Sequence, residues 1–72
     1  MDYMTIYLRD DKEVSLEEYL KLRVEDMRAE QDNGNPMSIG TMIYLMCVND
    51  GRGEPSILNG HKYKISTKVI KE

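Results

Sequence analysis

The dipeptide Asn59-Gly60 constrains the fold more than any other feature of this sequence. It separates a short run, residues 55–58, from a run beginning at His61 in which apolar residues alternate with lysines. Asn-Gly between two such runs predicts a two-residue hairpin, because both central residues of a type I′ turn need positive φ. The alternation gives the hairpin an apolar face and a basic face. The apolar face carries Leu58, His61, Tyr63, Ile65, Thr67 and Val69, and the other carries Ile57, Lys62, Lys64, Ser66 and Lys68.

A third strand and a first helix are expected before the hairpin. Residues 3–9, YMTIYLR, alternate with period two and predict a strand, which DDKE ends as a solvated turn. Ser15 and Glu18 have the spacing of a capping box, and the apolar residues that follow predict a helix over 15–32. The expected core is Leu16, Leu20, Val24, Ile39, Ile43, Met46, Tyr63 and Ile65.

The second predicted helix, over 38–50, differs in kind. Ser38 caps it, and the following residues leave almost no polar side. A helix that is apolar all round is buried on several faces or meets a partner. Its methionines suit core filling or an adaptable protein-binding surface. Met42 and Met46 are expected in the core, and Met37 and Tyr44 are candidates for exposure.

These elements predict one α+β domain spanning residues 1–72, with the order β-α-α-β-β. Two helices pack on a short antiparallel sheet that includes strands near 55–58 and 61–69. The formal net charge of −3 is polarised, because the acidic residues concentrate in the first half and lysines in the last third. Such polarisation suggests either a directional partner or a solvated surface with chance clustering.

Two short motifs resemble the excisionase and MerR-like group of small winged-helix proteins from phages and mobile elements. SIGT, Ser38 to Thr41, is similar to the Ser-x-x-Thr start of that group's recognition helix. PSILNGHKYKI, residues 55–65, resembles the Pro-x-x-x-Asp/Asn-Gly-basic-x-Tyr wing. The resemblance implies a winged-helix fold and an accessory or regulatory factor that binds DNA through a basic C-terminal wing. The DNA-binding residues would be Lys62, Lys64, Lys68, His61, Arg52, Ser38, Thr41 and Tyr44.

A second reading is protein binding. The helix after SIGT reads MIYLMCV and lacks the cations that phosphate contacts need. The chain would then be an inhibitor or adaptor, such as a phage-encoded inhibitor of a host protein. It would use its apolar second helix or its acidic first helix.

Enzymatic chemistry is not expected. His61 is the one histidine and has no partner spaced for catalysis. Cys47 is expected to be a buried structural thiol, and a single cysteine favours a reducing, cytoplasmic setting. No cofactor, metal ion or small-molecule substrate is expected, and no segment suits a membrane.

Overall fold

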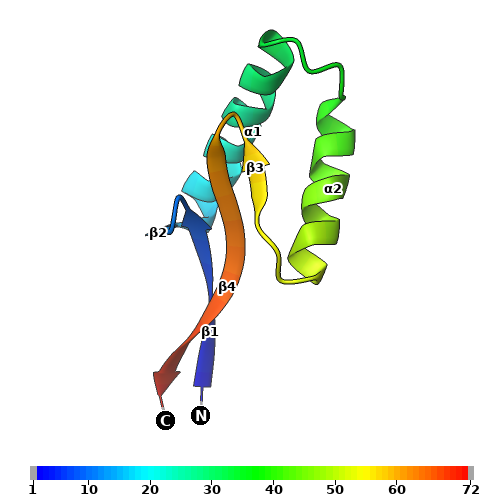
Figure 1. Ribbon diagram of the computed structural model, residues 1–72. Coiled ribbons are helices and arrows are strands. Elements are labelled where there is room, and N and C mark those ends of the chain that lie inside the picture. The colour runs from blue at the N-terminus through cyan, green and yellow to red at the C-terminus, as the bar shows by residue number, and fades with distance from the viewer. Residues whose placement is uncertain (1, 72) are drawn as a thin grey trace.

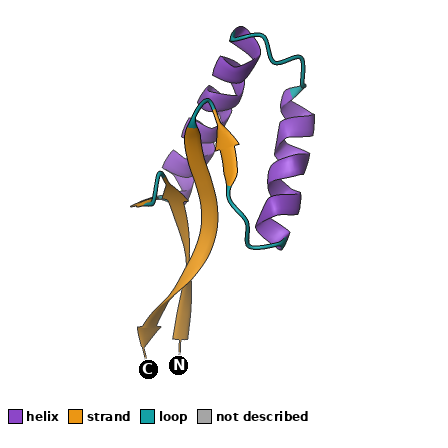
Figure 2. Cartoon of the chain, in the orientation of Figure 1, coloured by secondary structure: helices purple, strands orange, loops and turns teal. Residues whose placement is uncertain are grey.

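A four-stranded antiparallel sheet and two helices form the computed structural model of this chain, which describes residues 2–71 (Figure 1). The elements in chain order are β1 (Asp2–Arg9), β2 (Lys12–Val14), α1 (Leu16–Asp32), α2 (Ile39–Gly51), β3 (Ser56–Leu58) and β4 (His61–Lys71). The α+β class is confirmed, and the predicted helices and strands lie within two residues of the observed bounds. Figure 2 shows how strands dominate the two ends of the chain and helices its middle.

The strand order in the sheet is β2-β1-β4-β3, so the two longest strands are central. Asn59 and Gly60 both have positive φ, as the predicted type I′ turn requires. The pairing of Leu58 with His61 confirms the predicted hairpin register.

The expectation of a simple turn at DDKE was incomplete. Asp10 and Asp11 both have positive φ and form a second two-residue turn, after which β2 pairs with the end of β1. The order is therefore β-β-α-α-β-β. Sequence alternation missed β2 because three residues, two of them charged, are too short a run to show a period.

Side-chain caps begin both helices as expected. Ser15 Oγ accepts the Glu18 N–H at 3.1 Å, and Ser38 Oγ accepts the Thr41 N–H at 3.2 Å. Each bond satisfies one of the amide groups that the first helical turn leaves without a partner. Gly34 has a positive φ at the turn after α1.

The core lies between α1, α2 and the face of the sheet that α1 covers. Its methionines confirm the core-filling role expected for Met42 and Met46, and Tyr19 packs edge-on against Tyr63 with ring centroids 5.4 Å apart. The buried apolar side chains among the described residues are Tyr19, Met27, Met42, Met46, Leu58 and Tyr63. Those partly buried against them include Tyr7, Val14, Leu22, Met37, Ile39, Ile43 and Ile65.

The predicted inner face of α1 was wrong for Leu16 and Leu20, which are exposed. The helix instead faces inward along Tyr19, Arg23 and Asp26. Arg9 Nη2 lies 3.1 Å from Asp26 Oδ2, and the Tyr63 hydroxyl also donates to that oxygen. These bonds to two strands fix the rotation of α1 and leave Leu16 and Leu20 on its outer side.

Two further burial predictions were wrong. Cys47 is exposed, because α2 buries Met42 and Met46 and the next residue along turns away from that stripe. Met37, a candidate for exposure, is partly buried against the core. Tyr44 is 66% exposed, as expected.

β1 and β4 continue past their neighbours as a two-stranded ribbon. β2 pairs with residues 7–9 and β3 with residues 61–63, whereas β1 and β4 stay paired as far as Asp2 and Lys71. Figure 1 shows this ribbon extending beyond the helices to the two chain ends. It accounts for the elongated shape, 47 Å in the longest dimension against 20 and 17 Å.

Candidate binding groove between α2 and β3

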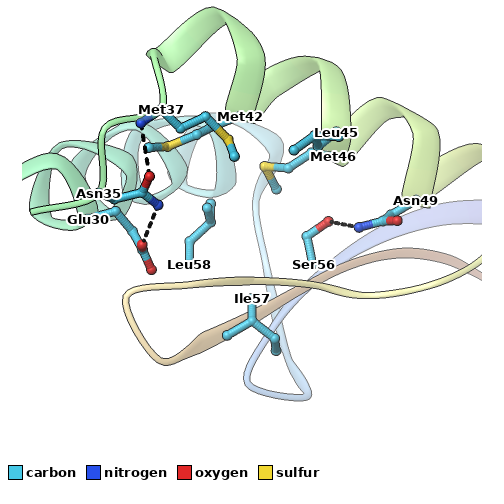
Figure 3. Close-up of a pocket in the computed structure, with 10 residues that line it drawn as sticks. All are labelled: Glu30, Asn35, Met37, Met42, Leu45, Met46, Asn49, Ser56, Ile57 and Leu58. Carbon is cyan, nitrogen blue, oxygen red and sulfur yellow. Dashed lines mark hydrogen bonds between the residues drawn. The ribbon is translucent and has the colours of Figure 1, made fainter.

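A groove with a volume of about 200 Å³ lies between α2, β3 and the C-terminal end of α1. Buried Met42, Met46 and Leu58 form its apolar floor, and Leu45 stands at its rim with 43% of its surface exposed. In Figure 3 Leu58 and Ser56 point from β3 towards α2, whereas Ile57 points to the opposite side of the strand. Three methionines line the groove, counting the partly buried Met37, and methionine adapts its shape to irregular partners.

One end of the groove is held by Glu30 of α1. Its carboxylate accepts the Asn59 N–H at 2.6 Å and a hydrogen bond from Asn35 Nδ2 at 3.0 Å. The Asn35 side chain in turn accepts the Met37 N–H at 2.9 Å (Figure 3). The hydrogen bonds from Asn35 and Asn59 lower the pKa of Glu30, which is therefore ionised at neutral pH. They connect α1, the hairpin turn and the start of α2.

The other end is held by Asn49. Its side-chain amide donates to Ser56 Oγ at 2.9 Å, which attaches the last turn of α2 to the start of β3. The Asn49 carbonyl also accepts the Arg52 and Glu54 N–H groups, at 3.0 and 2.9 Å. Gly53 has the positive φ that this tight connection requires. The groove thus has fixed ends and a methionine floor.

The edge of β3 adds backbone groups to this groove. β3 is an edge strand, and its hairpin pairs Leu58 with His61 directly across a two-residue turn. That pair exchanges hydrogen bonds, and the ladder alternates along the strand, so the N–H and C=O of Ile57 point away from β4. Ile57 lines the groove although its side chain points away. An extended segment laid along β3 would find a donor and an acceptor there.

The predicted wing residues come together as expected, but most of them contact acids. The register places Lys62, Lys64 and Lys68 on the sheet face opposite α1. Lys62 Nζ lies 2.7 Å from Asp11 Oδ1, and Lys68 Nζ lies 3.2 Å from Glu13 Oε2. Within residues 2–71, Lys64 forms no ion pair.

His61 and Lys62 also meet Asp10, in the turn between β1 and β2. Asp10 Oδ1 accepts the Lys62 N–H at 2.8 Å, and Asp10 Oδ2 lies 2.7 Å from His61 Nδ1. The hydrogen bonds from the Lys62 amide and His61 lower the pKa of Asp10. The turn of DDKE therefore places three carboxylates beside the basic side chains of β4.

The other predicted DNA-binding residues lie away from the wing. Ser38 and Thr41 bond to each other across the N-terminus of α2, with 2.9 Å between their hydroxyl oxygens. Tyr44 is exposed on α2, and Arg52 follows the C-terminal end of that helix without an ion pair in the described part of the chain. β3 separates α2 from β4 in Figure 1, so the eight residues do not form one surface.

Sequence reasoning missed the polar residues that build the groove and core. Glu30 and Asp26 were not among the candidate site or core residues, yet with Tyr19 and Arg23 they recur at helical spacing. That spacing was a usable signal for one face. Asn35 lies in the predicted turn between the two helices and Asn49 near the end of the second, and the side-chain contact of Asn49 with Ser56 is set by the tertiary structure.

Searches of protein-family models, curated proteins and solved structures found no match to this chain. Neither helix in residues 2–71 combines the length and apolar character of a membrane span. The same residues contain no cluster of three or more side chains suited to metal binding.

Proposed function

We propose that this chain is a non-enzymatic protein-binding module, an inhibitor or adaptor, that holds a short extended segment of a partner protein between α2 and β3. The observation that carries the proposal is the methionine-lined groove beside the open edge of β3. Its volume is below the roughly 300–1,000 Å³ of a small-molecule site. It suits one or two side chains of a segment whose backbone pairs with β3.

The charge around the groove selects the kind of segment. Glu30 is the one lining residue with a charged side chain in the described part of the chain, and its hydrogen bonds keep it ionised. An aliphatic side chain on the methionine floor, with a lysine or arginine placed near Glu30, would complement both features. The exposed Leu45 at the rim enlarges the apolar contact area.

A displayed library of random eight-residue peptides tests this proposal. The expected result is enrichment of peptides that combine aliphatic residues with a lysine or arginine. Leu45→Asp should abolish this binding, because it places a charge at the rim of the groove. Leu20→Asp is the matched control, since Leu20 is similarly exposed, at 40%, but lies on α1 and does not line the groove.

Glu30→Gln separates charge from shape. The Asn59 N–H and the Asn35 side chain donate to different oxygens of Glu30, so glutamine keeps an acceptor for one of these bonds while the charge is lost. The library should then lose its preference for basic residues and keep its preference for aliphatic ones. No enrichment, or enrichment unchanged by Leu45→Asp, would refute the groove as the binding site.

DNA binding of the excisionase kind remains the second candidate. It is supported by the common face of Lys62, Lys64 and Lys68, and by Lys64, which has no acidic partner in residues 2–71. Two of these lysines already contact carboxylates, which weakens the field available to phosphates. Three full phosphate contacts would give a log-log salt slope of roughly −3 on duplex DNA.

Titration of a labelled duplex at low salt distinguishes the candidates. We expect the log-log salt slope of duplex binding to be shallower than the value for three phosphate contacts. The Lys64→Ala variant should make that slope shallower still. Tight binding with the full slope, lost in the Lys62/Lys64/Lys68 triple alanine variant and unchanged in Leu45→Asp, would favour the DNA function. An exposed free thiol at Cys47 fits the cytoplasmic setting proposed for either function.

A further inference from the structure

The ribbon leaves one edge of β4 open from Lys64 to Lys71. β3 covers residues 61–63, and in the described residues no strand pairs with the remainder of that edge. Val69 and Ile70 on this part of β4 are 45% and 57% exposed. A two-stranded ribbon is marginally stable in water, so a long open edge with exposed apolar residues favours a further strand.

The backbone groups that face this edge follow from the hairpin. His61 and Tyr63 exchange hydrogen bonds with β3, because His61 directly follows the two-residue turn. Residues at alternate positions repeat this direction along the strand. The N–H and C=O groups of Ile65, Thr67 and Val69 therefore point away from β1, towards the open edge.

We propose that a second copy of this chain pairs with this edge, so that two β4 strands run antiparallel about a twofold axis through Thr67. Thr67 faces its own counterpart, Ile65 faces Val69, and Ser66 faces Lys68. The two sheets then join into one. A twofold contact of this kind closes after two copies, because each copy uses the same edge.

The lysines of β4 select this register. With Thr67 on the axis, no lysine faces a lysine, and the β-branched Ile65 and Val69 form favourable cross-strand pairs. A shift of two residues in one direction places Lys64 opposite Lys68, and the same shift in the other direction places Lys68 opposite Lys68. Like charges directly opposite each other are destabilising, so both neighbouring registers are disfavoured.

The mass in solution tests whether the dimer forms. Sedimentation equilibrium up to about 1 mM protein is suitable, because an interface this small gives a weak dimer. The mass should approach twice the 8.4 kDa of one chain. Thr67→Pro removes one edge N–H from each copy and should weaken association about 5- to 150-fold. Thr67→Ala keeps the N–H and should still dimerise.

Cysteine cross-linking tests the register. In a Cys47→Ser background, Thr67→Cys places two thiols on paired residues whose Cα atoms lie about 5.5 Å apart, within reach of a disulfide. Oxidation should convert this variant to a covalent dimer, and Ser66→Cys should remain largely monomeric. A monomeric wild type would overturn the proposal. A dimer unaffected by Thr67→Pro, or a Ser66→Cys variant that cross-links equally well, would overturn this interface. The Leu45→Asp variant tests the groove separately and should still dimerise.

Discussion

The hydroxyl of Tyr63 donates a hydrogen bond to Asp26 Oδ2, and this bond joins β4 to α1 inside the core. Arg9 completes the cluster from β1, with Nε donating to the Tyr63 hydroxyl at 2.9 Å and Nη2 to Asp26 at 3.1 Å. Burial is the first cause of the raised pKa of Tyr63, and its bond to Asp26 adds to it, so the phenol stays protonated and can donate.

Tyr63→Phe should therefore lower the free energy of unfolding by about 1–3 kcal/mol, because the buried Asp26 loses a donor. The matched control is Tyr19→Phe. The Tyr19 hydroxyl is buried without a hydrogen-bond partner in the described residues, so its removal should cost less than about 0.5 kcal/mol or stabilise the fold. Urea denaturation measures both. Equal losses in the two variants would contradict the role given to the Tyr63 hydroxyl.

The inward face of α1 and the floor of the groove are tested by a pair of alanine substitutions. Met46→Ala should destabilise the fold by about 2–5 kcal/mol, since Met46 is fully buried and its truncation leaves a cavity. Leu20→Ala should change stability by less than about 0.5 kcal/mol, as is usual for exposed positions. A large loss at Leu20 in thermal or urea denaturation would mean that α1 is rotated towards its leucines.

Two glycines that differ in backbone conformation give opposite predictions for the same substitution. Gly60 has φ +79°, and Gly40 lies in the first turn of α2. A Cβ at either position would meet no atom within 4 Å beyond the adjoining backbone. Gly60→Ala should destabilise by about 1–2 kcal/mol through left-handed strain. Gly40→Ala should stabilise by about 0.4–1 kcal/mol, because alanine lowers the conformational entropy of the unfolded chain. Effects of the same sign would argue against the type I′ hairpin.

Protonation of Asp10 should lower the free energy of unfolding in acid. Its pKa is lowered in the folded chain by the Lys62 amide and by His61, so its contribution is present above its unfolded pKa of about 4. That contribution is lost as the pH falls through the lower folded pKa. Asp10→Asn should therefore flatten the decline in unfolding free energy between pH 5 and acid, measured by urea titrations at each pH. An unchanged decline would contradict the contacts assigned to Asp10.

Asp50 should behave in the opposite direction and serves as the control. Burial raises its pKa, so its ionisation opposes folding at neutral pH and this cost disappears as the pH falls through its folded pKa. Asp50→Asn should increase the free energy of unfolding at pH 7 relative to wild type. The decline in acid that depends on Asp10 should remain. Loss of stability at pH 7 would instead indicate that the Asp50 carboxylate is favourably paired.

The sequence by itself determined the local structure of this protein. The Asn59-Gly60 turn, the caps at Ser15 and Ser38 and the alternation of residues 3–9 specify nearby backbone conformations, and all of them are present. Local signals of this kind depend on residues within one turn or one strand, so they can be read without knowing the fold.

Only the tertiary structure decided which faces are buried and which groups form the groove. Bonds from Arg9 and Tyr63 to Asp26 orient α1 so that Leu16 and Leu20 stay exposed. The contacts of Glu30 with Asn35 and Asn59 set one end of the groove. The partners in these contacts that are distant in sequence are brought together by the tertiary fold, and no regular interval in the sequence indicates them. A buried polar contact outweighs a periodic apolar stripe because an unsatisfied carboxylate costs more than two half-exposed leucines.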